Sequence, residues 1–178
     1  VLPPRCLPAR TRAAVCGNLH RMSHPAAAAA LAALQTRIGQ EVQVSDWLPI
    51  MQERVDAFAE ATGDHQWIHV DAERARRESP FGGPIAHGYL TLSLLVMLRD
   101  LVDPAKQVPG VRQVINYGLD KVRFPAPVPV NSRLRGHFNL QAFDLIEGGA
   151  QLKIAVTVEL EGSAKPACVA EALIRQYV

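Results

Sequence analysis

One segment that is apolar on almost every side, residues 86–99, constrains the fold more than any other part of this chain. A helix without a polar face is buried on most of its sides, so this segment predicts a helix inside a core. Beyond it the hydrophobic period changes to two, which is typical of strands, over residues 111–124, 132–146, 151–160 and 167–178. One buried helix and four long consecutive strands predict an α+β fold, with a curved antiparallel sheet wrapped around the helix.

Turn signals separate these strands. Glu147, Gly148 and Gly149 predict a hairpin between the second and third strands, and residues 161–166 predict a longer turn before the fourth. A run of alternate prolines, residues 125–129, predicts a stiff connector after the first strand.

Shorter elements are expected before the apolar helix. The alanine-rich residues 25–35 have high helix propensity, and this helix is expected to cover one edge of the fold and to stop at Gly39. Residues 41–44 alternate like a strand, and residues 47–50 predict a second short extended piece. Residues 51–61 then predict an amphipathic helix that leads to the functional stretch described below.

Composition limits the classes of function. The chain has 178 residues, of which 48% are hydrophobic, and its formal net charge is +2. Residues 1–40 hold five arginines and no acidic residue, so the remainder is mildly acidic and offers no electrostatic surface for nucleic acid. The sequence has no run of 18 apolar residues, so no membrane span is predicted. We expect a single domain over residues 22–178, after a disordered or non-native extension, residues 1–21, in preference to a targeting signal.

Three cysteines, Cys6, Cys16 and Cys168, form no disulfide framework, which indicates a reducing, cytoplasmic location. Cys168 lies in an alternating strand pattern. It is therefore expected to be a small buried side chain and not a nucleophile.

Residues 61–71 gather the groups able to handle a proton near neutral pH. Gly63 is expected to end the preceding helix and leave Asp64 on a loop, and His69 follows five residues later. Two further ionisable residues have ordinary explanations: His65 as a solvated or supporting side chain, and Asp71 as the N-cap of a helix over residues 72–77.

A second feature follows at the start of the apolar helix. Backbone N–H groups in a first helical turn lack intrahelical partners, and Gly88 has no side chain to obstruct an approaching carbonyl oxygen. His87, just before it, is expected to shape this turn more than to transfer protons.

Three motifs in order then carry a resemblance: Gly63-Asp64 with His69 and Asp71, residues 84–88 before the apolar helix, and residues 122–128. The chain resembles the MaoC-like dehydratases, the (R)-specific enoyl-CoA hydratases with a hot-dog fold, and is most similar to their NodN-like single-domain members. The resemblance implies that Asp64 and His69 are the catalytic pair and that the Gly88 N–H polarises the thioester carbonyl. It also implies a long central helix, about residues 88–102, and a homodimer that binds acyl-CoA near its interface.

One departure from the family pattern concerns substrate preference. The family has Asn-Pro between its catalytic residues, where this chain has Gln66 and Trp67. The spacing from Asp64 to His69 is kept, so the pair is still expected to converge. Trp67 is expected to pack against substrate or against neighbouring strands.

The predicted reaction is reversible addition of water to a trans-2-enoyl-CoA, giving an (R)-3-hydroxyacyl-CoA. It needs no metal or redox cofactor, because the acid–base pair moves the protons and an N–H group binds the developing oxyanion. Two alternatives remain: a non-catalytic acyl-CoA-binding hot-dog protein, and an acyl-CoA thioesterase. The paired Asp64 and His69 favour hydration over both.

Seven residues are candidates for contact with the substrate: Trp67, His87, Tyr89, Ser93, Asn116, Lys121 and Arg123. Several have a structural alternative. The Ser93 hydroxyl is expected to bond back to a carbonyl one turn earlier. Lys121 and Arg123 share a strand face, where they either meet CoA phosphates or are solvated. The apolar side chains of Tyr89, Leu92 and Met97 are most simply explained as core, or as the lining of an acyl tunnel.

Overall fold

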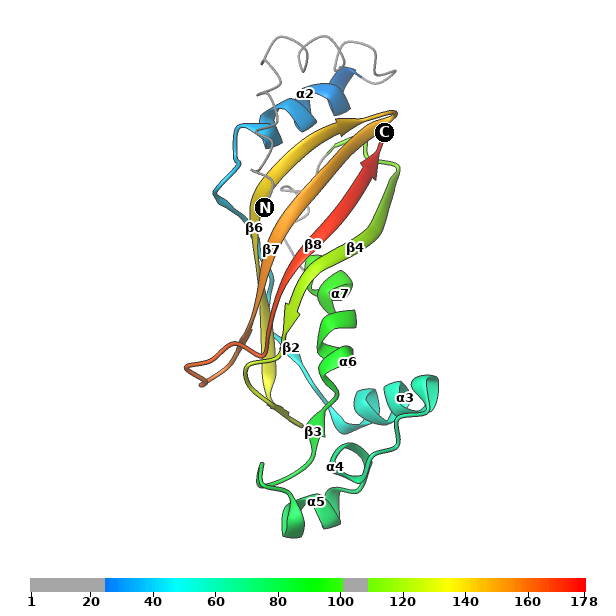
Figure 1. The fold of residues 1–178 in the computed structure, drawn as a ribbon, viewed down its shortest axis with the longest axis vertical. Coiled ribbons are helices and arrows are strands. Elements are labelled where there is room, and N and C mark those ends of the chain that lie inside the picture. The colour runs from blue at the N-terminus through cyan, green and yellow to red at the C-terminus, as the bar shows by residue number, and fades with distance from the viewer. Residues whose placement is uncertain (1–24, 101–108) are drawn as a thin grey trace, which may run out of the picture.

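The computed structural model describes residues 25–100 and 109–178, and the predicted extension, residues 1–21, lies outside them. A curved antiparallel sheet dominates the fold, with strand order β1-β6-β7-β8-β4 and with β2 pairing beside β1 on β6 (Figure 1). Its strands are β1 (Glu41–Val44), β2 (Leu48–Pro49), β4 (Gln113–Arg123), β6 (Arg133–Ile146), β7 (Gly149–Leu160) and β8 (Cys168–Tyr177). The four long predicted strands are therefore confirmed, as is the hairpin, in which Ile146 faces Gly149 across the turn.

The apolar segment forms two helices in line beside the sheet, α6 (Gly88–Ser93) and α7 (Leu95–Asp100) (Figure 1). Leu90, Leu94 and Leu98, each four residues apart, are buried and join the core cluster. The packing is close, since a Cβ atom on Gly136 of β6 would lie 3.2 Å from the Cβ atom of Leu98. A glycine at this point lets the helix approach the strand backbone.

The expected long helix is present as two helices in line, but the expectation that it is buried on most of its sides needs a correction. The helix is interrupted by a turn at Leu94, and Ser93 just before it directs its hydroxyl to the Tyr89 carbonyl at 2.8 Å, a bond that often bends a helix. Two of the side chains predicted as core are exposed, Tyr89 by 71% and Met97 by 37%, while Leu92 is half-buried. The sheet of one chain covers only one side of the helix, so the other apolar side is left open.

The alanine-rich helix α2 (Pro25–Gln35) forms as predicted and lies near one end of the sheet (Figure 1). Leu31 is fully buried in the core cluster. The chain turns at Gly39, whose N–H donates to the Leu140 carbonyl of β6 at 2.7 Å. This helix thus covers an edge of the fold, at the end away from the site described below.

Three helices gather at the opposite end of the molecule: α3 (Gln52–Thr62), α4 (Trp67–Val70) and α5 (Ala72–Glu78) (Figure 1). Asp71 caps α5 by accepting from the Arg74 N–H at 2.9 Å, which confirms that prediction. The proline-rich connector is more than a spacer, because it contains β5 (Val128–Pro129), which pairs with β3 (Ile85–Ala86) just before α6. These two-residue strands are too short to show a period in the sequence.

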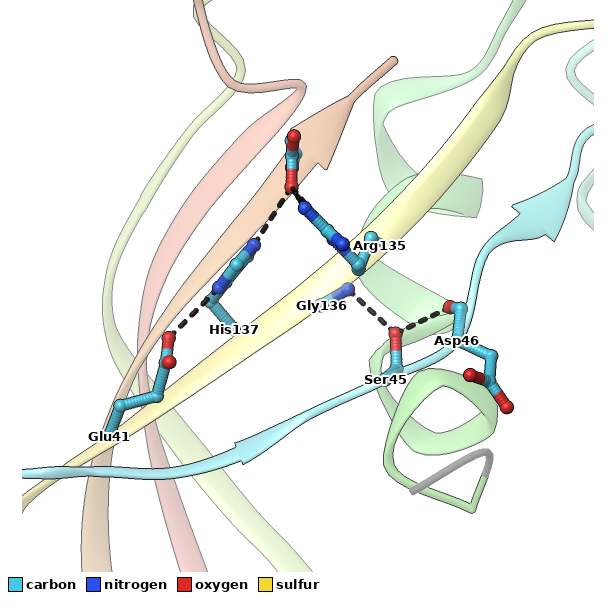
Figure 2. Close-up of polar contacts among 7 residues, drawn as sticks. Glu41, Ser45, Asp46, Arg135, Gly136 and His137 are labelled. Atoms are coloured by element: carbon cyan, nitrogen blue, oxygen red, sulfur yellow. Dashed lines mark hydrogen bonds and ion pairs between the residues drawn. The ribbon is translucent and has the colours of Figure 1, made fainter. Parts of the chain in front are cut away.

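An ionic cluster ties β1 to the sheet on its face away from α6 and α7. His137 bridges two carboxylates, with Nδ1 2.9 Å from Glu41 and Nε2 2.9 Å from Glu159, and Arg135 also pairs with Glu159 (Figure 2). On the same strand the Gly136 N–H donates at 2.8 Å to the buried Ser45 hydroxyl, which itself donates to the Asp46 carbonyl (Figure 2). Both contacts fix the N-terminal strands.

Candidate active site

Asp64 lies on the short loop between α3 and α4. Helix α3 ends at Gly63, which has a φ of 76° and donates its N–H to the Ala59 carbonyl, as its predicted role as a helix stop requires. The Asp64 side chain is 54% exposed, so its carboxylate can meet water or a ligand. It points toward the buried His87, with Oδ2 3.9 Å from Nε2 of that ring.

His69 is held at both its backbone and its ring. The Gln52 side chain donates to its carbonyl at 2.8 Å, and its own Nδ1 lies 2.7 Å from the Ile85 carbonyl oxygen. A carbonyl oxygen only accepts hydrogen bonds, so Nδ1 carries the proton and Nε2 keeps the lone pair of a base. Burial is the largest influence on this ring and lowers the pKa of His69, with repulsion from His87 acting in the same direction. The neutral, basic form is therefore favoured.

His87 joins the two halves of the site. Its ring is 3% exposed, stacks on His69 with centroids 3.8 Å apart, and lies 5.1 Å from the ring of Phe58. Its Nε2 is 2.9 Å from the Asp64 backbone carbonyl oxygen, 23 residues earlier in the chain. This contact was not foreseen from the sequence, where only the neighbouring Gly88 drew attention to His87.

Asp64, His69 and His87 each offer a ligand atom within 4.8 Å of the others, and they are the one group in the described ranges able to hold a metal ion. The hydrogen bonds favour another use of these atoms. His69 Nδ1 and His87 Nε2 are each directed to a backbone carbonyl, so these two nitrogens carry protons and have no lone pair to give a metal, while the lone pair of His87 lies on the buried Nδ1. The exposed carboxylate beside a basic imidazole is instead suited to holding a water molecule and moving its proton.

Gly88 opens α6 directly after His87 and is half-buried. The Phe124 ring lies against it, so that a Cβ atom on Gly88 would be 3.1 Å from two carbons of that ring. Phe124 also meets Tyr89 edge-on, with centroids 6.1 Å apart. The sequence did not predict that Phe124 lies at the site, because an aromatic residue at the end of a strand is most simply explained as core.

Two of the predicted substrate contacts come together in a cavity of 280 Å³ between the helices and strands β4 and β8. Ser93 and Asn116 line it, with Arg99 and mainly apolar side chains that include Leu92, Leu119 and Ile174. The predicted back-bond of Ser93 to the Tyr89 carbonyl is confirmed and uses the hydroxyl proton. The oxygen of that hydroxyl can still accept a hydrogen bond.

The remaining candidates lie elsewhere. Lys121 pairs with Glu171 at 2.7 Å, and Glu171 alternates with buried Ala170 and Ala172, which places this pair on the face of the sheet away from the core. Arg123 donates to the Val122 carbonyl. Trp67 of α4 packs beneath the Arg74 guanidinium, whose central carbon is 4.5 Å from the ring centroid.

Two expectations of ordinary roles are confirmed. His65 is exposed, with Nδ1 3.7 Å from a Glu60 carboxylate oxygen. Cys168 is fully buried, and burial raises the pKa of its thiol to about 11, so it is not a nucleophile at neutral pH.

The curved antiparallel sheet with a helix beside it is the hot-dog fold, and Asp64 and His69 lie next to the start of that helix. Residues 33–163 match the family model described as the MaoC like domain. The chain therefore belongs to the MaoC-like dehydratase family.

Named relatives agree with this assignment. The chain is 55% identical over 146 residues to 3-hydroxyacyl-thioester dehydratase Z of Mycobacterium tuberculosis H37Rv. The aligned residues cover 82% of this chain and 94% of that protein. It is 47% identical to nodulation protein N of Rhizobium leguminosarum bv. viciae, covering 79% and 86%. Among solved structures, R-hydratase PhaJ1 from Pseudomonas aeruginosa superposes with a TM-score of 0.62 at 26% identity, covering 79% of this chain and 81% of that one.

Proposed function

We propose that this protein is an (R)-specific enoyl-CoA hydratase, which adds water reversibly to a trans-2-enoyl-CoA to form an (R)-3-hydroxyacyl-CoA. Asp64 and His69 hold the water against C3, and one of them takes its proton as the new C–O bond forms. The electrons of the double bond move toward the thioester oxygen, where the Gly88 N–H binds the developing charge. A proton returned from the pair to C2 completes the addition, and CoA is the only carrier needed.

The observation that carries this proposal is the state of His69. Its Nδ1 is committed to the Ile85 carbonyl, which leaves Nε2 as a base, and burial with a lowered pKa favours the unprotonated ring. A general base must be unprotonated to take a proton from water, and the lowered pKa favours that form of His69. Asp64 alone would fit a thioesterase, whereas a carboxylate paired with a basic imidazole fits a reaction that takes a proton from water and returns one to carbon.

The cavity of 280 Å³ is the proposed pocket for part of the acyl chain. Its apolar lining comes from both the helices and the sheet, and it begins on the same helix that presents Gly88. Burying an acyl chain there contributes about 0.8 kcal/mol for each methylene group. Ser93 and Asn116 offer polar atoms in this pocket.

We also propose that two copies form a homodimer through β4 and the open side of the helices. Strand β4 is an edge strand of the sheet, and its apolar side chains are exposed, as are several on α6 and α7. These residues are Tyr89, Val96, Met97, Val114, Ile115, Tyr117 and Leu119. Light scattering should give twice the chain mass for the wild type and a single chain mass for Leu119→Glu.

The activity is tested with crotonyl-CoA. Hydration removes the absorbance of the conjugated double bond without releasing thiol, hydrolysis releases free CoA, and a binding protein does neither. We expect hydration by the wild type and its loss in Asp64→Asn and His69→Gln, with the (R)-3-hydroxy product identified by chiral chromatography. Full hydratase activity in both variants would refute the site, and thiol release by the wild type would refute the reaction.

A further inference from the structure

His87 has contacts that its predicted role in shaping a turn does not explain. Its ring is almost fully buried, yet its Nδ1 has no hydrogen-bond partner among the described residues. Leaving a polar atom buried without a partner costs stability. A plain apolar side chain would shape the same turn without that cost, so the polar ring has a use at its other nitrogen.

That other nitrogen determines the tautomer. Nε2 lies 2.9 Å from the Asp64 carbonyl oxygen, which can only accept. His87 therefore donates its proton from Nε2, and the buried Nδ1 holds the lone pair. In this tautomer the ring acts as a donor to the Asp64 backbone.

The Asp64 loop depends on this donor. Within the described residues, the other hydrogen bond of Asp64 runs from its own N–H to the Thr62 hydroxyl and is long, at 3.5 Å. The loop residues 63–66 are all exposed. The bond from His87 thus ties the backbone of an exposed loop to the start of the core helix.

The same ring also contacts the second member of the pair. His69 stacks on it with centroids 3.8 Å apart and planes inclined by 28°. One side chain therefore touches the backbone of Asp64 through a hydrogen bond and the ring of His69 through its face. Displacement of a reacting group by about 1 Å costs roughly 100-fold in rate, so such a link has kinetic value.

We propose that His87 is a positioning residue, which holds Asp64 by the Nε2–H bond to its carbonyl and holds His69 by stacking. The proposal rests on the proposed hydratase function for its kinetic consequences. Beyond that function, the proposal assigns His87 the Nε2–H tautomer. It also assigns the hydrogen bond to the placement of Asp64 and the stacking to the placement of His69, two effects that can be tested separately.

Two substitutions separate these contacts. His87→Phe keeps an aromatic ring against His69 but has no donor for the Asp64 carbonyl. His87→Gln places an amide N–H near the position of Nε2 but has no ring to stack. We expect His87→Phe to lower kcat by roughly 100-fold with KM within a few-fold. His87→Gln should recover about tenfold of that loss, because it restores one hydrogen bond to the Asp64 carbonyl.

A matched control removes another buried side-chain hydrogen bond, one that joins the segment after β1 to strand β6. Ser45→Ala deletes the hydroxyl that accepts from the Gly136 N–H (Figure 2). It should lower the melting temperature as a His87 variant does but leave kcat unchanged. Equal kcat in His87→Phe and the wild type, or a His87→Gln no more active than His87→Phe, would overturn the proposal.

A measurement without turnover separates this proposal from the hydratase assignment. Nitrogen-15 NMR of the imidazole rings should show His87 in the Nε2–H form, and amide exchange of residues 64–66 should quicken in His87→Phe and not in Ser45→Ala. An Nδ1–H tautomer, or exchange unchanged in His87→Phe, refutes the positioning role even if the enzyme hydrates crotonyl-CoA. Failure of the wild type to hydrate crotonyl-CoA, with the NMR result intact, refutes only the reaction.

Discussion

The ring of His69 is joined to the backbone of Ile85 by a hydrogen bond of 2.7 Å from Nδ1 to the carbonyl oxygen. Ile85 belongs to β3, the short strand that leads into His87 and Gly88. One bond thus sets the orientation of the proposed base and connects it to the segment that presents the oxyanion donor. The base and the donor share a support, although they are far apart in the sequence.

The bond to Ile85 allows two roles of His69 to be tested separately: the stability that comes from Nδ1 and the base activity that comes from Nε2. His69→Asn places an amide N–H near the position of Nδ1 and keeps the bond to Ile85, but it has no basic nitrogen at the position of Nε2. We expect kcat to fall by roughly 10²–10⁴-fold, the range for loss of a general base. His69→Leu should lose the same activity and also about 1–3 kcal/mol of unfolding free energy, because the Ile85 carbonyl loses its partner. Denaturant titration with a crotonyl-CoA assay checks both, and near-normal kcat in His69→Asn would exclude this base.

Gly88 and Phe124 give a second prediction. A Cβ atom on Gly88 would lie 3.1 Å from the Phe124 ring, so Gly88→Ala must displace that ring or the first turn of α6. Moving an oxyanion donor out of place should reduce kcat by roughly 10²–10³-fold. In the double variant Gly88→Ala with Phe124→Leu, the smaller side chain gives room and part of the kcat should return. No recovery in the double variant would mean that the contact with Phe124 is not the cause.

Much of this arrangement follows from local pattern in the sequence. The amphipathic helix before Gly63, the β6–β7 hairpin and the Asp71 cap depend on neighbouring residues, and the structure has each of them. The proposed pair Asp64 and His69 was found through the family motif. Their convergence next to the start of α6 is consistent with that motif.

Other features depend on contacts that no local pattern carries. The pairing of β3 with β5 joins segments of two residues each, and the bond from His87 to Asp64 spans 23 residues. The exposure of Tyr89 and Met97 contradicts an apolar pattern that predicts burial, since periodicity reports that a face is apolar and not which chain covers it. The end of the predicted central helix, residues 101 and 102, lies outside the described residues.

Asp71 tests whether an acidic residue near the pair has only a structural role. Its carboxylate accepts from the Arg74 N–H at 2.9 Å, which is an N-cap and not a contact with the site. Asp71→Ala should lower the unfolding free energy by about 0.5–2 kcal/mol, while Asp71→Asn should stay near the wild type because asparagine also caps helices. The value of kcat should be unchanged in both. A large loss of kcat in Asp71→Asn, with stability retained, would assign this carboxylate to catalysis.

The bridge of His137 between Glu41 and Glu159 predicts how stability varies with pH (Figure 2). Burial opposes the charged ring, but the hydrogen bonds to Glu159 and Glu41 outweigh it and raise the pKa of His137 above its ordinary 6.5. The folded state therefore holds this proton more tightly than the unfolded state. The resulting stabilisation is complete below the unfolded pKa and is lost as the pH rises through the folded pKa.

At acidic pH the stabilisation by this cluster is limited by protonation of Glu159. Hydrogen bonds from His137 and then Arg135 lower the pKa of Glu159, so its contribution is present above the ordinary 4.5 and is lost as the pH falls through the lower folded pKa. The cluster is therefore most stabilising between the pKa of Glu159 and that of His137. Because these side chains are partly exposed, the effect should be about 1 kcal/mol or less.

Thermal melts of the wild type and His137→Gln across this range test the bridge. The wild type should melt higher near pH 6, by at most roughly 2–4 °C, and this advantage should shrink as the pH is raised beyond the folded pKa of His137. Arg133→Gln is the matched control. Arg133 lies on β6, as His137 does, and the substitution breaks its ion pair with Glu161, while arginine itself does not titrate in this range. The melting difference between Arg133→Gln and the wild type should stay constant as the pH is raised from about 6, because Glu161, whose pKa is lowered by the hydrogen bond to Arg133, is ionised throughout that range. If the melting difference between His137→Gln and the wild type is also constant with pH, then His137 does not make the attachment of β1 pH-dependent.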